Sequence, residues 1–431
     1  MRPVAFGTDG IRGPAGTHPI TSEVGAAVGR AACRLARALG GDRVVIARDT
    51  RPSGPELAAA VAAGVGQAGG TSLDAGVVPT SAVGLAVHAA LADVGVMVTA
   101  SHNPEPDNGF KILGAGGRKL DEAAVAAVEA WIAAEGAEVD GATHRDVADE
   151  VSDLWRRAVQ AAVPDTTALS GRRFAVDLAN GAGTAALPWL SSWLPGIEAT
   201  GISGTINGGC GSEHLGALSE RVVAQALDGG IALDGDADRV RLVDEAGRVV
   251  DGDAVIWLLA RHLAAPAIAV TVMSGGALDK QLPGVRVVRT AVGDRHVRGA
   301  MDRDALVLGG ERSGHVLFGD VAAGDGLIAG LRALVAAWSS HERLSGAFAA
   351  FKPLPSHLSK VEVRARPSLD GIPPLSEICA ASEDRLGPHG RVLLRYSGTE
   401  PVLRILVEGD EADVVAQVAE QVASVARRVL G

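Results

Sequence analysis

The chain has 431 residues and a net charge of -11 at pH 7, and 47% of its residues are hydrophobic but only 3% aromatic. At roughly 100 to 200 residues per domain, this length predicts two to four domains, with cores built from Ala, Val and Leu. The negative charge argues against nucleic acid or an anionic membrane surface as the main partner. It leaves room for a local cationic pocket that binds phosphate.

Cysteine usage and hydropathy indicate the cellular compartment in which we expect the protein. The three cysteines form no CxxC pair, which argues against a disulfide framework or a Cys-based zinc site and is typical of a reduced compartment. Residues 1–20 lack the basic head and apolar core of a secretory signal. The most apolar stretch, 256–275, is interrupted by Arg261, His262 and Pro266, which argues against a membrane span. We expect a cytoplasmic protein, monomeric or homodimeric, that acts on small molecules.

Short apolar strands alternate with Ala-rich helices over most of the chain, which is the pattern of α/β units. In the first segment a strand at 43–47 precedes a helix at 55–68, and a buried apolar strand at 94–98 follows another strand and helix. A polar, Ala-rich helix at 121–135 and a Gly/Asp/Thr stretch near 140–150 mark the expected end of the first domain.

The second and third segments repeat this alternation. Their expected strands lie at 173–177, 230–233, 240–243, 248–250, 267–273, 285–289 and 305–308. In each of the three segments a polar loop follows a late apolar strand, at 99–104, 234–239 and 310–315. Ligands in open α/β sheets bind at the carboxyl ends of strands, so three similar units can direct these loops into one cleft.

The fourth segment, from about Pro353, has a different pattern. Its expected elements are a strand at 360–363, a helix from Leu375, strands at 391–396 and 402–407, and a helix at 410–430. These elements predict a small α+β domain, and 352–356 is a candidate linker. The expected domains span 1–148, 149–250, 251–352 and 353–431.

The loop 99–104 reads Thr-Ala-Ser-His-Asn-Pro and places the Ser101 hydroxyl beside the His102 imidazole at the end of a buried strand. Asn103-Pro104 predicts a turn, since proline pushes the preceding residue out of the helical region. Ser101 is therefore either a nucleophile or a turn residue, and turn preferences alone favour the turn residue.

The loop 234–239 reads Asp-Gly-Asp-Ala-Asp-Arg and places three carboxylates in five residues. Carboxylates this close repel one another, so we expect shifted protonation or a bound cation. Oxygen ligands without a nearby His or Cys favour Mg²⁺ or Ca²⁺ over zinc. An EF-hand is disfavoured because Arg239 stands where the calcium loop needs Gly, and an exposed Asp turn is the remaining alternative. Mg²⁺ commonly takes a phosphate oxygen as well, which predicts a phosphoryl group opposite this loop.

Two further stretches carry weaker signals. The segment 395–401, Arg-Tyr-Ser-Gly-Thr-Glu-Pro, with Arg404 beyond it, has the composition of a phosphate-binding loop or of a hairpin turn. Glu311, Ser313 and His315 on a glycine-flanked loop suit sugar hydroxyls, although a structural loop explains them as well.

Two cations complete the candidate set. Arg12 lies in the Gly-rich stretch 7–13, and Lys111, one of five lysines, follows the serine loop. A solvated surface position is the alternative for Lys111. A serine at a strand end, a three-Asp metal loop, a hydroxyl-reading loop and a phosphate-binding loop are together the parts of a sugar-phosphate phosphoryl-transfer site.

Along essentially its whole length the sequence resembles the α-D-phosphohexomutases. The stretches that carry the resemblance are 6–13, 99–104, 107–111, 177–183, 206–212, 234–239, 292–295, 310–315 and 395–401. The resemblance implies three similar α/β domains, each with a mixed sheet and helices on both sides. It also implies a C-terminal α+β domain like the TATA-box-binding protein, and an active cleft at the centre.

The resemblance further implies an intramolecular phosphotransferase, in which a phosphoserine enzyme and Mg²⁺ interconvert glucosamine 6-phosphate and glucosamine 1-phosphate through a sugar 1,6-bisphosphate. The implied catalytic residues are Ser101, His102, Arg12 and Lys111. The implied metal ligands are Ser101, Asp234, Asp236 and Asp238. The implied substrate-binding residues are Arg239, Asp294, Arg295, Glu311, Ser313 and His315. The implied phosphate-binding residues are Arg395, Ser397, Gly398, Thr399 and Arg404.

Two positions differ from the members of the family that act on glucosamine phosphate. Arg312 replaces a Gln in the loop expected to contact the 3- and 4-hydroxyls of the sugar, and Ala237 replaces a Gly in the metal loop. A mutase for glucose or mannose phosphates, or for a specialised sugar pathway, is therefore an alternative. A metal-dependent serine phosphatase and a non-catalytic sugar-phosphate sensor are alternatives of other classes. The sensor is disfavoured because Ser101 and all three Asp are present.

Overall fold

The chain folds into two compact units. The structure is a computed structural model, and it describes residues 3–7, 9–134, 143–201, 203–397 and 401–431. The large unit comprises Met1–Met273 and Val288–Ala349, and the small unit comprises Ser274–Val287 and Ala350–Gly431. Each unit is described by itself below.

The first sheet of the large unit is mixed and has six strands in the order β1-β5-β4-β2-β3-β6. Its strands are β1 (Ile11–Pro14), β2 (Arg43–Arg48), β3 (Thr71–Val77), β4 (Val94–Val98), β5 (Asp107–Leu113) and β6 (Thr143–Asp146). Strands β2, β3, β4 and β6 run parallel, whereas β5 is antiparallel to β4 and to β1. All five residues of β4 are buried, as expected for a central strand covered on both faces.

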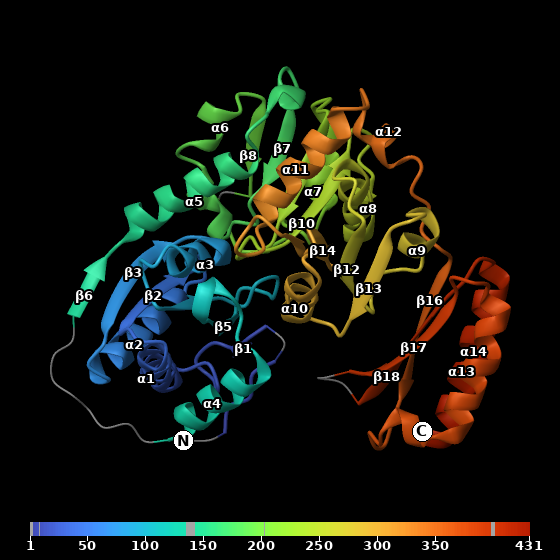
Figure 1. Cartoon of the computed structure of the whole chain (residues 1–431), viewed down its shortest axis with the longest axis horizontal. Helices are drawn as coiled ribbons and strands as arrows, with labels where there is room; N and C mark the ends of the chain where they lie inside the picture. Colours follow the sequence, from blue (N-terminus) through green and yellow to red (C-terminus); the bar gives the residue numbers. More distant parts are fainter. Residues whose placement is uncertain (1–2, 8, 135–142, 202, 398–400) are drawn as a thin grey trace. The chain divides into compact units, whose positions relative to one another are not determined.

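Helices cover both faces of this sheet (Figure 1). They are α1 (Ser22–Ala38), α2 (Gly54–Gln67) and α4 (Glu122–Ala133) on one face, and α3 (Thr80–His88) and α5 (Ala148–Ala162) on the other. Two glycines allow α1 and α2 to cross closely. A Cβ atom on Gly29 would lie 2.0 Å from the Val61 carbonyl oxygen, and one on Gly64 would lie 1.9 Å from that of Ala26.

The second sheet has the order β11-β10-β9-β7-β8. Its strands are β7 (Phe174–Asp177), β8 (Ile197–Thr200), β9 (Gly229–Leu233), β10 (Val240–Asp244) and β11 (Val249–Val250). The first three run parallel, and β10 and β11 add an antiparallel hairpin at one edge. The short helix α6 (Leu190–Trp193) follows β7 in sequence, and α7 (Gly216–Ala224) packs on β7 and β9.

The third sheet has the order β13-β12-β14-β15. Its strands are β12 (Ala267–Thr271), β13 (Arg286–Thr290), β14 (Leu308–Gly310) and β15 (Val316–Phe318). The helices of this part are α8 (Gly252–His262), α10 (Asp294–Asp304), α11 (Gly326–Trp338) and α12 (Leu344–Phe348). Helix α11 also packs on β9 and β10, so it joins the second and third sheets.

The predicted strand at 305–308 is wrong by about three residues. Ala305 has a left-handed backbone, with φ 52°, that ends α10, and β14 begins only at Leu308. The apolar run from Ala305 therefore includes the end of a helix and a connection as well as the start of a strand.

The small unit is an antiparallel three-stranded sheet in the order β16-β18-β17, with helices packed against it. Its elements are α9 (Ala277–Gln281), β16 (Ser356–Glu362), α13 (Pro373–Leu386), β17 (Arg391–Tyr396), β18 (Val402–Glu408) and α14 (Ala412–Leu430). Leu403, Ile405 and Val407 alternate along β18 into a core shared with the helices.

The predicted start of the first small-unit strand at residue 360 is also wrong, because β16 begins at Ser356 inside the expected linker. Polar residues at its start hide the strand from hydropathy, but every residue from Ser356 to Glu362 has a partner on β18. The fold class, with mixed α/β sheets and a small C-terminal α+β domain, is confirmed. The predicted boundaries of the four domains stay a prediction.

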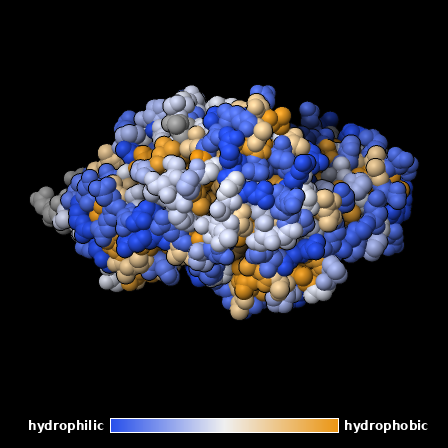
Figure 2. Space-filling view, turned by 90° about the horizontal axis from the view of Figure 1, so that it is seen from above, coloured by the Kyte–Doolittle hydropathy of each residue, from blue (hydrophilic) through white to orange (hydrophobic). Residues whose placement is uncertain are grey.

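Single-turn helices complete the described elements. They are η1 (Ala115–Gly117), η2 (Thr167–Leu169), η3 (Ala182–Ala186) and η4 (Leu369–Gly371). Within the described ranges no helix is both long enough and apolar enough to cross a membrane. On the face shown in Figure 2, apolar side chains lie in small groups between polar ones.

The close crossing of α1 and α2 predicts that Gly64→Ala lowers stability by about 2 kcal/mol, since an added methyl group must push the two backbones apart. Gly299→Ala is the matched control. Gly299 is also helical but has no heavy atom within 4 Å of a built Cβ, so alanine should be neutral or stabilise by up to about 1 kcal/mol. Thermal unfolding of both variants tests this, and equal midpoints would contradict it.

Candidate active site

Ser101 lies in a tight turn directly after β4. Its backbone is left-handed, with φ 52°, and its side chain is fully buried. The Ser101 N–H donates to Thr99 Oγ1 at 2.8 Å, and the Ser101 hydroxyl donates to Asp234 Oδ2 at 2.5 Å. The turn therefore directs the hydroxyl toward the aspartate loop of the second sheet.

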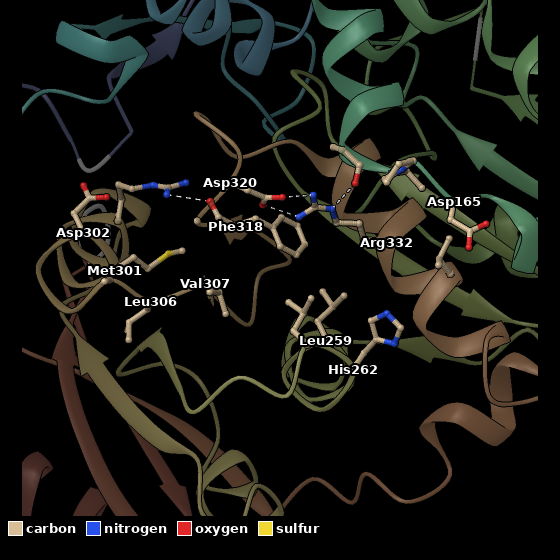
Figure 3. Close-up of a pocket in the computed structure, with 18 residues that line it drawn as sticks. Asp165, Leu259, His262, Met301, Asp302, Leu306, Val307, Phe318, Asp320 and Arg332 are labelled. Carbon is tan, nitrogen blue, oxygen red and sulfur yellow. Dashed lines mark hydrogen bonds and ion pairs between the residues drawn. The ribbon is translucent and has the colours of Figure 1, made fainter.

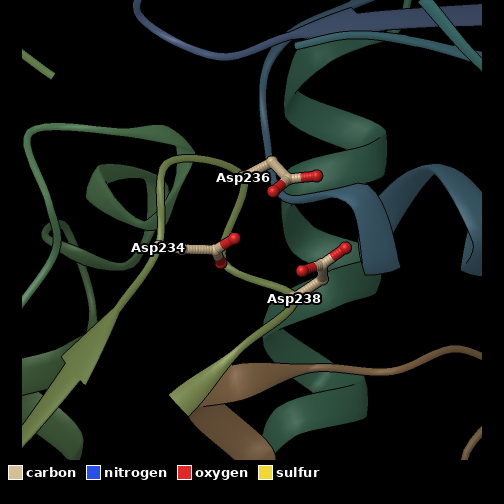
Figure 4. Close-up of side chains that lie close together, drawn as sticks. All are labelled: Asp234, Asp236 and Asp238. Atoms are coloured by element: carbon tan, nitrogen blue, oxygen red, sulfur yellow. The ribbon is translucent and has the colours of Figure 1, made fainter. Parts of the chain in front are cut away.

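The three aspartates follow β9 and point toward one another (Figure 4). Carboxylate oxygens of Asp234, Asp236 and Asp238 all lie within 4.8 Å of each other, and all three side chains are buried. Ala237 between them has a left-handed backbone with φ 57°. Glycine adopts that conformation more easily than alanine.

Backbone bonds from three parts of the large unit hold the aspartate loop. The N–H of Thr80 donates to the Asp236 carbonyl at 3.1 Å, and the N–H of Ala182 donates to the Gly235 carbonyl at 2.8 Å. The N–H of Gly326 donates to the Ala237 carbonyl at 2.9 Å. The loop is therefore fixed from the first, second and third segments at once.

Lys111 on β5 supplies the positive charge nearest to the aspartates. Its Nζ donates to Asp236 Oδ2 at 2.6 Å and to Asp238 Oδ2 at 2.9 Å. Burial acts to lower the pKa of Lys111, but Asp236 and Asp238 outweigh it and raise this pKa above its usual value. Thr80 also donates its hydroxyl to Asp236. The surface-lysine alternative for Lys111 is wrong, since the side chain is only 2% exposed.

Among the described residues, Asp234 is the one aspartate of the three to which Lys111 donates no hydrogen bond. Burial, and then repulsion from Asp238 and Asp236, raise the pKa of Asp234 to about 7. One buried oxygen on each of Asp236 and Asp238 has no hydrogen-bond partner. Three buried carboxylates with two unsatisfied oxygens form a donor set that fits a hard divalent cation.

His102 lies beside the Ser101 hydroxyl, and Arg12 and Arg239 contact its neighbours in the same turn. His102 Nδ1 lies 3.4 Å from Ser101 Oγ and accepts from Arg239 Nη1 at 3.0 Å. Burial, and then the charges of Arg239 and Arg12, lower the pKa of His102 to about 4. The imidazole is therefore neutral near pH 7. Arg12 on β1 reaches Asn103 Oδ1 at 3.5 Å, beside the same turn.

The loop after β14 brings residues of the third sheet to the aspartates. His315 Nδ1 lies 3.6 Å from Asp238 Oδ1, and its Nε2 lies 3.3 Å from Asp294 Oδ2. Burial acts to lower the pKa of His315, but Asp294 and Asp238 raise it above its usual value. Glu311 Oε1 accepts from the Gly293 N–H at 3.1 Å, and so ties this loop to the start of α10. Ser313 is half-buried in the same loop.

Arg295 and Arg312 form ion pairs with acidic side chains on neighbouring helices. Arg295 Nη2 lies 3.7 Å from Glu122 Oε1 on α4. Arg312 Nε lies 3.5 Å from Asp251 Oδ2 and 3.9 Å from Asp253 Oδ2, at the start of α8. Arg312, which differs from the family pattern, is therefore paired with acidic residues at the start of α8.

The candidate phosphate loop lies in the small unit, between β17 and β18. Arg395 stands directly opposite Arg404, and Lys360 of β16 stands opposite Arg404 on its other side. This register places three cationic side chains side by side across the sheet. Arg404 Nη2 donates to Ser397 Oγ at 3.3 Å. Gly398 and Thr399 lie outside the described residues.

Several residues of this network are absent from the sequence predictions. Lys119 Nζ donates to Asp294 Oδ1 at 2.8 Å and also to Asp9, which pairs in turn with Arg12. Lysine scarcity is the one signal that could have identified Lys119, because the chain has only five lysines. The same signal applies to Lys360, but its place beside Arg404 depends on strand register, which the local sequence does not show.

Two cavities differ in their relation to these residues. One of about 350 Å³ is lined by Asp238, Asp294, Arg295 and His315, among others. A larger cavity of about 810 Å³ has an apolar wall of Leu259, Met301, Leu306, Val307 and Phe318 (Figure 3). None of the candidate site residues lines the larger cavity, so size alone does not identify the site of chemistry here.

Family models match three parts of the chain. The models are described as phosphoglucomutase/phosphomannomutase alpha/beta/alpha domain I at residues 3–138, domain III at 251–353 and the C-terminal domain at 358–425. A protein named phosphoglucosamine mutase from Paracoccus denitrificans is 42% identical over 443 residues, and the match covers 97% of both chains.

Solved structures share the fold. A phosphoglucomutase/phosphomannomutase family protein from Burkholderia thailandensis has a TM-score of 0.77 at 24% identity, with 99% of this chain and 96% of that chain covered. An Aspergillus fumigatus N-acetylphosphoglucosamine mutase, solved in complex with GlcNAc-6P and magnesium, has a TM-score of 0.67 at 19% identity. That match covers 100% of this chain and 96% of the other.

The contacts of Lys111 predict a link between stability and divalent cations. Lys111→Met leaves Asp236 and Asp238 without their ammonium partner, which should cost about 3–5 kcal/mol in EDTA. Because a divalent cation can balance the same carboxylates, Mg²⁺ should restore more of the lost thermal stability in this variant than it adds to the wild type. Thermal unfolding with and without Mg²⁺ measures both effects.

Lys280→Met is the control, since Lys280 pairs at 2.6 Å with Asp410 and both side chains are substantially exposed. It should change stability by less than about 1 kcal/mol, with no dependence on Mg²⁺. A Lys111 variant with unchanged stability in EDTA would contradict the proposed charge balance.

Proposed function

The chain belongs to the phosphoglucomutase/phosphomannomutase family, and we propose that within it the protein is a phosphoglucosamine mutase. The reaction is the interconversion of glucosamine 6-phosphate and glucosamine 1-phosphate. The observation that carries this proposal is the 2.5 Å bond between the Ser101 hydroxyl and Asp234, inside a cluster of three buried carboxylates.

Ser101 is the phosphoryl carrier in this proposal. It transfers its phosphoryl group to the free 6- or 1-hydroxyl of the sugar monophosphate, which gives the 1,6-bisphosphate. The bisphosphate then turns over in the cleft, and Ser101 takes back the other phosphoryl group. A Mg²⁺ ion held by Asp234, Asp236, Asp238 and a phosphoserine oxygen would supply Lewis-acid stabilisation of the transferred group. The Aspergillus neighbour was solved in complex with magnesium, which agrees with this choice of metal.

The side chains around Ser101 supply charge and a proton acceptor. Arg12 and Lys111 stabilise negative charge on the transferred phosphoryl group. His102 is neutral near pH 7, because burial and its arginine neighbours lower its pKa to about 4. Its Nδ1 lies 3.4 Å from Ser101 Oγ but accepts from Arg239 Nη1, so it would assist the movement of the proton of the reacting hydroxyl only once that bond opens.

The non-reacting phosphate is assigned to the small unit. Arg395, Ser397 and Arg404 are the described members of this phosphate site, and Gly398 and Thr399 are its expected backbone donors. The row of opposed cations supports the assignment, because guanidinium and ammonium groups bind phosphate oxygens through charge-assisted hydrogen bonds. The same residues would hold the substrate in either of its two orientations.

Sugar recognition is assigned to Glu311, Ser313 and His315, with Arg239, Asp294 and Arg295 around the phosphoryl site. Glucosamine phosphate is favoured over glucose or mannose phosphate by the 42% identical relative. A monomer or homodimer in the cytoplasm stays the expectation for this protein. A metal-dependent serine phosphatase would use the same nucleophile and cation, but it would release inorganic phosphate.

Ser101→Ala should lose interconversion by at least about 1000-fold while it still binds sugar phosphate, since only the phosphoryl acceptor is removed. Isomer formation and release of inorganic phosphate should be measured together, with binding measured by calorimetry. Ser382→Ala is the control, because the buried Ser382 hydroxyl bonds the Ile378 carbonyl on its own helix. Full isomerase activity without Ser101 would rule out the carrier role, and release of inorganic phosphate without isomer by the wild type would favour the phosphatase.

The pairing of Arg312 with Asp251 and Asp253 predicts that this residue does not select the sugar. Arg312→Gln should keep the ratio of kcat/KM between glucosamine 6-phosphate and glucose 6-phosphate within about threefold of the wild-type value. Glu311→Gln is the comparison and should reduce kcat/KM for both substrates. A shift of the ratio by more than about tenfold in the Arg312 variant would show that Arg312 reads the sugar.

A further inference from the structure

Arg51 is a fully buried arginine beside the Ser101 turn. It follows β2 closely, and both its side chain and that of Asp49 have no exposed surface. Arg51 Nε donates to Asp49 Oδ2 at 3.0 Å, which balances the buried guanidinium charge. A buried charge that makes a single ion pair is costly, so the remaining contacts of this guanidinium should explain its position.

The other four N–H groups of Arg51 all bond main-chain carbonyls of the serine turn. Nη2 donates to the carbonyls of Ser101 at 2.9 Å and Asn103 at 2.8 Å. Nη1 donates to the carbonyl of Asp107 at 2.7 Å and also to that of Pro104. A guanidinium has five N–H donors in a fixed plane. With the Asp49 bond, all five donors of Arg51 are used, and none remains for a phosphate or a sugar.

A second path runs from Arg51 to the Ser101 backbone through side chains. Asp49 Oδ2, which pairs with Arg51, also accepts the Thr99 hydroxyl at 2.6 Å. Thr99 Oγ1 in turn accepts the Ser101 N–H at 2.8 Å. Arg51 and Asp49 therefore hold both the N–H and the carbonyl of the residue proposed to carry the phosphoryl group.

The second segment holds the same carbonyls from another side. Asn207 Nδ2 donates to the carbonyls of Ser101 at 2.8 Å and Asn103 at 3.0 Å. Gly235 leaves room for this arrangement, since a Cβ atom there would lie 2.5 Å from the Ser101 carbonyl oxygen. These contacts offset the strain of the left-handed backbone at Ser101, which is unfavourable for a residue with a Cβ atom.

We propose that Arg51 is the positioning residue of the phosphoryl carrier: it fixes the Ser101–Asp107 main chain so that the Ser101 hydroxyl points at Asp234. Asn207 completes this arrangement from the second segment. The inference rests on the proposed function, because positioning matters only if Ser101 carries a phosphoryl group. Since every donor of Arg51 is used within the protein, Arg51 acts through the turn and not on the substrate.

Arg51→Lys tests the inference, because lysine keeps the charge beside Asp49 but cannot bond four carbonyls. A displacement of about 1 Å at a reacting group can lower the rate of chemistry 100-fold. We therefore expect kcat to fall about 100-fold while KM for glucosamine 6-phosphate stays within about threefold. The phosphorus-31 NMR signal of phosphorylated Ser101 should shift or broaden.

Arg332→Lys is the matched control. Arg332 is also paired with a carboxylate, that of Asp320, and its Nε donates to the main-chain carbonyl of Ala162 at 2.8 Å. It therefore has structural bonds of the same kinds without contact to the serine turn. Similar losses of thermal stability in the two variants, with a loss of kcat only in the Arg51 variant, would separate positioning from general destabilisation.

Asn207→Ala is the second variant, and it keeps the test valid if Arg51→Lys fails to fold. It should lower kcat by about tenfold with KM nearly unchanged. Where both variants fold, their effects should be non-additive, since the two side chains hold the same carbonyls. Unchanged kcat in a folded Arg51 or Asn207 variant would overturn the inference, and so would a rise in KM with kcat unchanged.

The wild-type enzyme separates this inference from the proposed function. If it forms no isomer and takes up no phosphoryl group on Ser101 from glucose 1,6-bisphosphate, the proposed function fails. If it does both, and Arg51→Lys matches it in kcat, only the positioning inference fails.

Discussion

The large unit depends on one electrostatic constraint: three buried carboxylates lie within 4.8 Å of one another on a single loop. Such a cluster is unstable unless positive charge and hydrogen-bond donors reach it from outside the loop. Lys111 arrives from the first sheet, His315 from the third, and Thr80 from the start of α3. The need to balance one loop therefore fixes how the three segments of this unit contact each other.

The surrounding polar contacts follow the same logic. Ser81, next to Thr80, donates at 2.5 Å to Asp325 Oδ2, which also accepts the Trp155 Nε1–H at 2.7 Å. Asp325 caps α11, whose first residue, Gly326, holds the aspartate loop through its N–H. Two adjacent residues on α3 thus connect the aspartate loop to a second buried carboxylate, so the helix ends around the site are mutually positioned.

The sequence reveals the residues that we propose to carry the chemistry more readily than those that hold them in place. Ser101 and the three aspartates could be predicted because each lies in a short motif at a strand end. Arg51 and Asn207 could not, because their contacts are main-chain carbonyls distant in sequence, which leave no local pattern. The errors in the fold have a similar origin. The positive φ at Ala305 and the pairing of a polar stretch with β18 depend on tertiary contacts and not on periodicity.

Each unit brings charges of one sign close together, and the two sets are opposite in sign. In the large unit Lys111 balances two of the three carboxylates, while burial, and then repulsion from Asp238 and Asp236, raise the pKa of Asp234 to about 7. In the small unit Lys360, Arg404 and Arg395 lie in register across three strands, and like charges there repel. In the proposed function a divalent cation would lie among the first set of charges and a phosphate dianion beside the second. The proposed reaction needs a metal ion and a sugar phosphate together, and each has the sign of charge that one of these two sets attracts.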